Sequence, residues 1–416
     1  EALLALWLRN VRIPDIVLGD IQAQIAACRV GERGLQRLAE RHGPDGLQRL
    51  MDEILDYTEW RVRVEIETMR DGIYSFVDHL DDDGFGSGPI RIEARLEVRG
   101  SDILVDFQGT SPQVEAALNG TLSFTKSSVY VALKCVTSPD IPANEGFYRP
   151  ITVTAPAGSI LNPARPAPRA ARGLTGYRTI EVLFGALAGA VPDRVPAAGE
   201  GGATMVTIGG LLEGRHPFVC VDAYCGGWGA RPDQDGVDGT SHVGTNVANV
   251  PAEEIELRQP LRVERYGFVP DTAGAGHYRG CLSLVRDLRL LSPEATLQIR
   301  SDRRRFLPYG LSGGGSGTPS MNVLNPGRGE RVLPTKLTMQ IREGDVVRHV
   351  TAGGGGSGDA LDRDPVLVAA EVADGIVTVV HARQAYGVIV DDVTLALDLE
   401  ATARLRAARG TDRKPS

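Results

Sequence analysis

Glycine is clustered in this chain, and the clusters restrict its fold more than any other feature of the sequence. Of the 416 residues, 50 are glycine, above the share of about 7% that is typical of globular proteins. Three blocks stand out: GGWG at 226–229, GGGSG at 313–317 and GGGGSG at 353–358. Glycine suits positions where φ is positive or the backbone must approach another group closely. Because apolar, strand-like segments flank each block, we expect three loops that converge on one site instead of flexible linkers.

Composition excludes several classes of protein. Hydrophobic residues make up 42% and charged residues 24% of the chain, as in an ordinary globular protein. A net charge of −8 provides no basic surface for nucleic acid, and the longest apolar run, 182–191, is too short to span a bilayer. The five scattered cysteines do not have zinc-site spacing. We therefore expect a cytoplasmic protein with reduced thiols that binds neither nucleic acid nor membrane.

Hydrophobic periodicity predicts the order of the elements. Apolar residues recur at helical spacing over 14–43, and Pro44 starts a second helical segment, which suggests an antiparallel helical hairpin. Residues 90–98 alternate apolar and charged side chains, as in a half-buried strand, and 103–107 would pair with them as a hairpin. Helices are predicted at 124–137 and 177–190. Further strands are expected at 205–208, 218–221, 282–291, 296–300 and 337–341.

This order predicts an α+β fold with an N-terminal helical hairpin, a large β-rich middle with glycine-rich loops and a C-terminal helical segment. Asp364 and Pro365 have the pattern of a helix N-terminus. The expected domains are a helical N-terminal segment (1–72), an α+β domain (73–200), a β-rich domain (201–350), a C-terminal α+β segment (351–409) and a polar tail (410–416).

The loop that follows the first glycine block is the strongest candidate for a functional site. It contains Asp235, His242 and Asn246 within a long stretch of low apolar content, and such loops are often functional. Histidine can transfer a proton near neutral pH or orient a ligand. A structural, hydrogen-bonding role for His242 is the alternative.

Two shorter segments could place polar side chains at a cleft. Asp106 ends a predicted strand before a glycine turn, with Asn119 downstream, and Asn144 and Glu145 lie in the turn-like sequence PANEG. A carboxylate or amide at such positions could contact a substrate or orient a water molecule. Aspartate and asparagine also cap turns routinely, so both interpretations stay open here.

The segment RSDR at 300–303 precedes the second glycine block. Arg300, Asp302 and Arg303 could form an ion pair that holds the loop, or they could bind a substrate carboxylate. The third block, by contrast, mimics a phosphate-binding loop but lacks the Lys-Ser/Thr that follows the glycines in such loops. We therefore do not expect this chain itself to bind ATP.

Several segments occur together in a recognisable order. They are 7–15, 106–111, 144–146 with 149–150, 226–239, 300–303 with 310–311, 351–358 with 364–365, and 386–388. In these segments the chain resembles the hydantoinase B and 5-oxoprolinase family, which also includes alpha-type subunits of acetone and acetophenone carboxylases.

The resemblance implies a hydrolase subunit that cleaves a cyclic amide of the hydantoin, N-methylhydantoin or 5-oxoproline class. It further implies a hetero-oligomer with a hydantoinase A-type partner, which uses ATP to activate the substrate. We predict catalytic roles for His242, Asp235, Asp106 and Glu145. The predicted substrate-binding residues are Asn119, Asn144, Asn246, Arg300, Asp302 and Arg303. A subunit of an ATP-dependent ketone carboxylase and a non-catalytic scaffold are the alternatives.

The family resemblance also bears on a metal. Family members carry a His-x-x-Asp motif and a later histidine ahead of the segment that corresponds to 7–15, and these residues bind a divalent metal such as Mn, Zn or Mg. This sequence starts after that region, without an initiator methionine. We therefore assign no metal ligand in this chain, expect preceding sequence to be missing, and expect the isolated fragment to be inactive.

Overall fold

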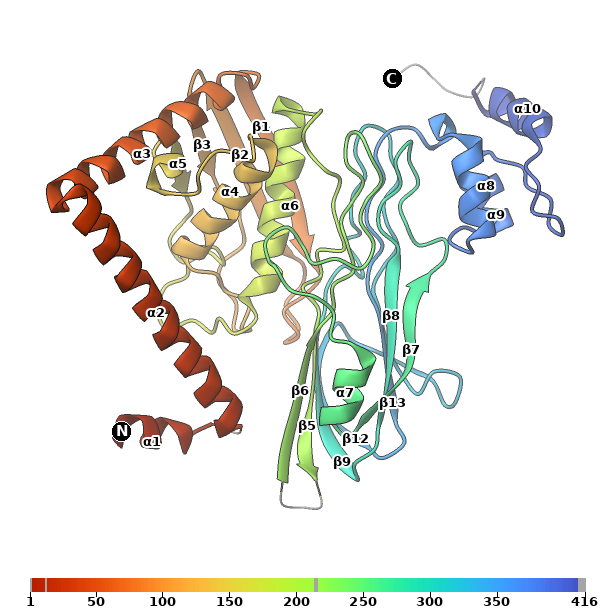
Figure 1. Ribbon diagram of the computed structural model, residues 1–416. Coiled ribbons are helices and arrows are strands. Elements are labelled where there is room, and N and C mark those ends of the chain that lie inside the picture. The colour runs from red at the N-terminus through yellow and green to blue at the C-terminus, as the bar shows by residue number, and fades with distance from the viewer. Residues whose placement is uncertain (1, 12, 213–215, 411–416) are drawn as a thin grey trace.

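The computed structural model describes residues 2–11, 13–212 and 216–410. The part of the predicted tail that follows residue 410 lies outside the described residues. Helices and three β-sheets are mixed along the chain, which confirms the predicted α+β class (Figure 1). Within the described ranges, no helix is both long enough and apolar enough to cross a bilayer.

The N-terminal region consists of three helices, of which the first two project from the rest of the molecule (Figure 1). They are α1 (Ala2–Leu8), α2 (Pro14–His42) and α3 (Pro44–Ile66). The break falls at Gly43, whose φ is 72°, as the sequence predicts. Figure 1 shows that α2 and α3 diverge from this junction, so the predicted side-by-side packing of the two helices is wrong. The reason is that α3 directs Thr58, Val62 and Ile66 into the main core, whereas every residue of α2 stays at least partly exposed.

A four-stranded sheet and three helices form the next layer. Strand β2 buries alternate residues from Ile90 to Val98, so the predicted half-buried strand is confirmed. It pairs antiparallel with β1 and β3, and β3 pairs parallel with β4. Helix α6 packs so closely against the sheet that a side chain at Gly185 would overlap the Phe76 ring of β1. The elements are β1 (Gly72–Leu80), β2 (Ile90–Arg99), β3 (Asp102–Asp106), α4 (Leu122–Val136), α5 (Glu145–Tyr148), β4 (Ile151–Thr154) and α6 (Arg172–Ala190).

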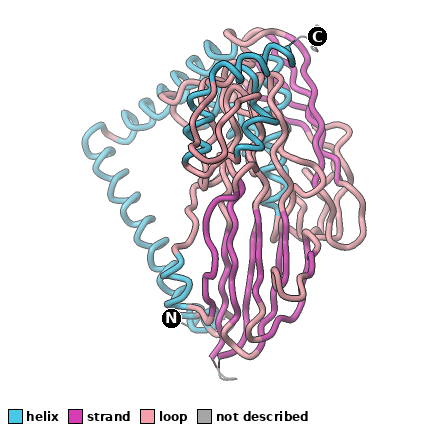
Figure 2. The backbone as a smooth tube through the Cα atoms, turned by 90° about the vertical axis from the view of Figure 1, so that its right-hand side faces the viewer, coloured by secondary structure: helices cyan, strands magenta, loops and turns pink. Residues whose placement is uncertain are grey.

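The β-rich middle is a sandwich of two antiparallel sheets, whose long strands fill the lower half of Figure 2. The strand orders are β12-β9-β5-β6 and β11-β10-β13-β8-β7. Apolar residues of both sheets, such as Ile299 and Leu288, form one shared core. The elements are β5 (Met205–Leu212), β6 (His216–Ala223), α7 (Ala252–Arg258), β7 (Leu261–Val269), β8 (Ser283–Leu290), β9 (Glu294–Arg300), β10 (Met321–Leu324), β11 (Arg331–Leu333), β12 (Lys336–Arg342) and β13 (Val346–Val350).

The C-terminal region is helical, with a small core of its own. The Asp364 carboxylate accepts a hydrogen bond of 2.8 Å from the Val366 amide, which confirms the predicted helix cap. The elements are a 3-10 turn (Ala360–Asp362), α8 (Pro365–Ala373), α9 (Val379–Tyr386) and α10 (Leu399–Gly410).

The three glycine blocks meet, as predicted, but they pack backbone against backbone. The Gly355 amide donates to the Ala198 carbonyl, and the Gly355 carbonyl accepts from the Ala230 amide, each at 2.8 Å. A side chain at Gly317 would overlap the carbonyl of Gly353, and one at Gly314 would overlap that of Gly356. We call this the glycine core; its blocks are 226–229, 313–317 and 353–358. Close backbone approach, rather than loop flexibility, explains why the sequence uses glycine here.

We predict that Gly317→Ala destabilises the protein by about 1–3 kcal/mol or prevents folding, because the added methyl group has no space. Gly267→Ala is the matched control, since a Cβ at this β7 position meets no atom within 4 Å. Urea unfolding of both variants measures the difference in the free energy of unfolding. Equal stabilities would contradict the close packing of the glycine core.

Candidate functional site

Five buried charged side chains join the helical layer to the β-sandwich. Asp78 comes from β1, Arg178 and Glu181 come from α6, and Asp302 and Arg303 follow β9. Arg178 Nη2 lies 2.9 Å from Asp302 Oδ2, and Arg303 Nη1 lies 2.8 Å from Asp78 Oδ2. Arg303 also bonds the Glu181 carboxylate. We call these five residues the ion cluster.

The backbone after β9 is shaped to deliver Arg303 to this cluster. Arg303 has a φ of 68°, a left-handed conformation that is uncommon outside glycine. The Asp81 carboxylate accepts hydrogen bonds from the amides of Arg304, Arg305 and Phe306, at 2.8, 2.9 and 3.1 Å. Burial opposes ionisation of Asp81, but these amides together lower its pKa below the usual value. An ionised Asp81 therefore holds the turn.

Burial changes the pKa values within the ion cluster. It raises the pKa of Asp302 to about 6, against the opposing effect of Lys336 and Arg178. Burial, together with repulsion from Arg178, lowers the pKa of Arg303 to about 10. Both groups are still charged at neutral pH, and the cluster is held by paired opposite charges.

His242 lies directly beside this cluster. Its ring stacks on Tyr177 of α6 with a centroid distance of 4.3 Å. Its Nδ1 accepts a hydrogen bond of 3.1 Å from the Gly244 amide, so the neutral ring carries its proton on Nε2. Nε2 lies 3.7 Å from Glu181 Oε1, too far for a hydrogen bond. Burial, and to a smaller extent Arg178, lowers the pKa of His242 to about 3, which keeps the ring neutral.

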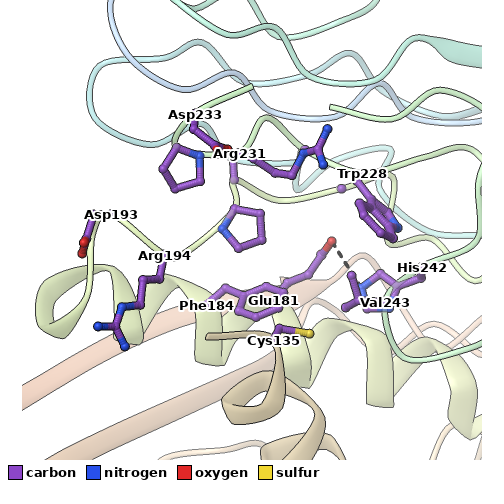
Figure 3. Close-up of a pocket in the computed structure, with 15 residues that line it drawn as sticks. Cys135, Glu181, Phe184, Asp193, Arg194, Trp228, Arg231, Asp233, His242 and Val243 are labelled. Carbon is purple, nitrogen blue, oxygen red and sulfur yellow. Dashed lines mark ion pairs between the residues drawn. The ribbon is translucent and has the colours of Figure 1, made fainter. Parts of the chain in front are cut away.

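Two cavities meet at His242. The first cavity encloses about 340 Å3, and Glu181 and His242 face each other in its wall (Figure 3). The second cavity encloses about 350 Å3 and is also lined by His242. The first is lined by Cys135, Glu181, Phe184, Asp193, Arg194, Pro196, Ala197, Gly199, Trp228, Gly229, Arg231, Pro232, Asp233, His242 and Val243. Polar residues lining the second include Tyr177, Glu200, Thr204, Thr245 and Arg300.

Sequence reasoning missed Arg178, Glu181 and Glu200. A usable signal existed for the first two, because charges three residues apart interrupt an otherwise apolar helix. Lys, Glu, Arg and Asp are rarely buried unless paired. Glu200, in the sequence GEGG, gave no such signal, since a glutamate between glycines is typical of an exposed loop.

Asp235 lies in a different network from His242. Its carboxylate forms a double ion pair with Arg363, at 2.7 and 2.8 Å, and accepts the Arg279 amide at 2.8 Å. Burial opposes the ionisation of Asp235. The pKa of Asp235 is nevertheless below its usual value, mainly because its carboxylate is hydrogen-bonded to Arg363. Asp235 thus connects the polar loop to the C-terminal helices.

Asp106, Asn119 and Asn144 make local structural hydrogen bonds. Asp106 accepts from the Thr154 hydroxyl at 2.8 Å. Asn119 donates to the carbonyls of Ala116 and Pro168, both at 3.0 Å. Asn144 caps α5 through the Gly146 amide and donates to the Thr58 hydroxyl of α3 at 3.0 Å.

The remaining candidates lie in three different environments. Glu145 and Asn246 are exposed. Arg300 lines the second cavity and bonds Gln298 at 2.6 Å. Asp302 and Arg303 belong to the ion cluster. The structure therefore brings His242, Arg300, Asp302 and Arg303 into one region and places Asp106, Asn119, Asn144, Glu145 and Asp235 in other surroundings.

The site offers few groups that could hold a metal. Within residues 2–11, 13–212 and 216–410, no three His, Cys, Asp or Glu side chains are grouped as a metal site requires. Glu181 and His242 supply only two such groups, fewer than the three protein ligands typical of catalytic zinc. We therefore derive no chemical step through a metal from these residues.

We predict that His242→Gln reduces the loss of unfolding free energy that occurs as the pH falls below neutral. The pKa of His242 is about 3 in the folded protein and about 6.5 when unfolded. Its contribution to stability is therefore complete above pH 6.5 and is lost at about 1.4 kcal/mol per pH unit as pH falls toward 3. Urea unfolding of both proteins between pH 7 and 4 tests this, and parallel curves would contradict a neutral, buried ring. His349 is also buried, but it is present in both proteins, so its contribution cancels when the two stability curves are compared.

Comparison with known proteins agrees with the resemblance in the motifs. The chain is 34% identical over 411 residues to the B-type subunit of a putative D-/L-hydantoinase from Pseudomonas sp. strain NS671, covering 95% of this chain and 69% of that protein. It is 31% identical over 429 residues to the caprolactamase beta subunit of Pseudomonas jessenii, covering 98% and 72%.

Solved structures share the fold. The crystal structure of the ATP-dependent caprolactamase from P. jessenii matches with a TM-score of 0.89 at 29% identity, over 98% of this chain and 72% of that one. A nucleotide-free acetone carboxylase structure matches with a TM-score of 0.87 over 99% and 62%, and its 19% identity shows the fold alone. The model of the family described as hydantoinase B/oxoprolinase matches residues 1–360. The chain belongs to the hydantoinase B/oxoprolinase family.

Proposed function

We propose that this chain is the B-type subunit of a cytoplasmic, ATP-dependent amidohydrolase that opens a cyclic amide of the hydantoin, N-methylhydantoin or 5-oxoproline class. Its proposed partner is a hydantoinase A-type ATPase subunit. The similar hydantoinase subunit from Pseudomonas and the ATP-dependent caprolactamase support this proposal. The observation that carries it is the Glu181–His242 pair facing the first cavity.

The proposed reaction divides the work between two proteins. An amide carbonyl is a poor electrophile because resonance delocalises the nitrogen lone pair, so ATP-driven activation by the partner would make ring opening feasible. This chain would then bind and orient the activated ring. Its third glycine block supports that division, since its backbone is occupied by contacts within the glycine core.

Glu181 and His242 have complementary roles in this proposal. The Nε2–H of the neutral His242 is a hydrogen-bond donor, and the Glu181 carboxylate is an acceptor. The distance of 3.7 Å between Nε2 and Oε1 is too long for a hydrogen bond between them. A substrate carbonyl could accept from Nε2–H while an attacking water donates to Glu181 Oε1. Arg303 would keep Glu181 ionised and fixed. With a pKa of about 3, His242 acts as a hydrogen-bond donor and an orienting group, the second of the two roles expected from the sequence, and not as a proton-transfer group.

The other predicted site residues receive different proposed roles. Asp302 would fix Arg178, and Arg300 would contact substrate from the wall of the second cavity. The hydrogen bonds of Asp106, Asn119, Asn144 and Asp235 described above favour structural roles. The exposed Glu145 and Asn246 have no place in the proposed reaction.

Reconstitution with an A-type subunit tests the function. We expect ATP-dependent ring opening of hydantoin, 5-oxoproline or a related lactam, measured by product formation with and without ATP. Incorporation of labelled bicarbonate into a ketone would favour the carboxylase alternative. Stable assembly with no turnover on any of these substrates would favour a scaffold.

In the same complex, we predict that His242→Ala lowers turnover roughly 10- to 100-fold, because a donor to the developing oxyanion is lost. His381→Ala, on α9 in the C-terminal helical region, is the control and should keep wild-type turnover. Assembly with the partner, followed by size-exclusion chromatography, should be unchanged in both variants. Unchanged turnover in His242→Ala would remove His242 from the site.

A further inference from the structure

The buried carboxyl group of Glu200 lies in the wall of the second cavity. Glu200 is 4% exposed and Thr204 is 1% exposed, and both line this cavity. Among the described residues, Glu200 Oε1 and Thr204 Oγ1 have no hydrogen-bond partner. The two atoms are neighbours, since a Cβ built on Gly202 would lie 2.5 Å from the first and 3.3 Å from the second. Buried polar atoms without a partner are rare in folded proteins, so this pair requires an explanation.

The glycine core holds Glu200 in this position. Its backbone amide donates to the Gly227 carbonyl at 3.0 Å. Its side-chain stem packs directly over Gly226, where any Cβ would collide with it. The carboxyl group is therefore fixed beside the cavity by packing and not by an ion pair.

The surroundings of Glu200 favour its neutral form. Arg178, whose positive charge acts on Glu200, is already bonded to Asp302 and to the His79 carbonyl. An unpaired carboxylate in a buried site is strongly unfavourable, so such a group takes up a proton instead. Burial accordingly raises the pKa of Glu200 to about 8, although the Gly202 amide and Arg178 oppose the change.

We propose that Glu200 and Thr204 form a subsite that recognises the amide edge of a cyclic amide. A protonated carboxyl group presents one O–H donor and one acceptor oxygen side by side. A ring forces its amide into the cis form, so that N–H and C=O lie on the same edge and can pair with both. Open-chain secondary amides are almost always trans and present these two groups on opposite edges. The Thr204 hydroxyl can add a hydrogen bond to the carbonyl oxygen.

This subsite deepens the proposed function and rests on it. The second cavity, at about 350 Å3, has room for a five- to seven-membered ring. His242 lines both cavities, so the cavity that would hold a ring at Glu200 shares the imidazole that faces Glu181. The neutral carboxyl would select the substrate class, and the Glu181–His242 pair would act on it.

Binding of small amides to the whole chain, without partner or ATP, tests the subsite. Titration calorimetry or NMR would compare 2-piperidone with its N-methyl derivative and with N-methylacetamide. We expect 2-piperidone to bind at least roughly tenfold more tightly than either, because each comparator loses one of the paired hydrogen bonds. Equal affinity for the three compounds, or no binding of 2-piperidone, overturns the proposal.

Substitutions test whether Glu200 binds the amide through a neutral or a charged carboxyl group. A glutamine side chain also presents a donor and an acceptor, so Glu200→Gln should retain affinity for 2-piperidone within about threefold. Glu200→Leu should lose it by roughly tenfold or more. Thr204→Val, which keeps the shape of the side chain, should weaken binding several-fold and serves where the leucine variant does not fold. Equal losses in the glutamine and leucine variants overturn the proposal.

The reconstituted complex distinguishes this inference from the proposed function. If Glu200→Leu does not change the rate at which the complex opens the ring, the subsite is overturned and the proposed function stands. Selective binding of 2-piperidone to this chain, with no ring opening in the complex, would refute the proposed function and uphold the subsite.

Discussion

The ion cluster is the interaction on which the rest of the structure depends. Its charges are withdrawn from water between two layers, and such charges are tolerated only where each is paired and hydrogen-bonded. Asp78 and α6 contribute from one side, and the turn after β9 contributes from the other. Removing one partner from a buried pair typically costs about 3–5 kcal/mol, because the other charge is left uncompensated. The cluster therefore fixes the helical layer and the sandwich in one relative position, and both cavities form along that junction.

The glycine core complements the ion cluster near the cavities. It brings the backbone of residues 197–200 against 226–230 and 353–356 through hydrogen bonds. From these loops the first cavity takes Ala197, Gly199, Trp228 and Gly229 as wall residues, and the second takes Glu200. Glu181 of the ion cluster lies against Gly201, where a side chain would overlap its carboxylate. The buried carboxyl groups of Glu181 and Glu200 are thus held by different means. Glu181 is paired with Arg303, whereas Glu200 is held by packing against Gly226.

The sequence predicted what local periodicity encodes. The alternation over 90–98 and the helical spacing over 14–42 were read correctly, because each depends on neighbours close in the chain. The divergence of α2 from α3 depends on which face α3 turns to the distant sheet, and the parallel pairing of β4 with β3 spans the two intervening helices α4 and α5. Likewise, His242 was singled out by its loop, whereas Glu181 and Arg303 each lie some sixty residues away from it, on opposite sides in the sequence. Pairings of that range leave no trace in periodicity.

The glycine core has a thermodynamic consequence. A conventional interior is built of apolar side chains, whose exposure to water on unfolding increases the heat capacity, while exposure of peptide groups decreases it. Contacts between main chains of 313–317 and 353–358 bury mostly peptide groups. This interior therefore contributes less to the curvature of the stability profile with temperature than an aliphatic one of equal size. Cooling should weaken the sandwich and its apolar interior before it loosens the junction that surrounds the two cavities.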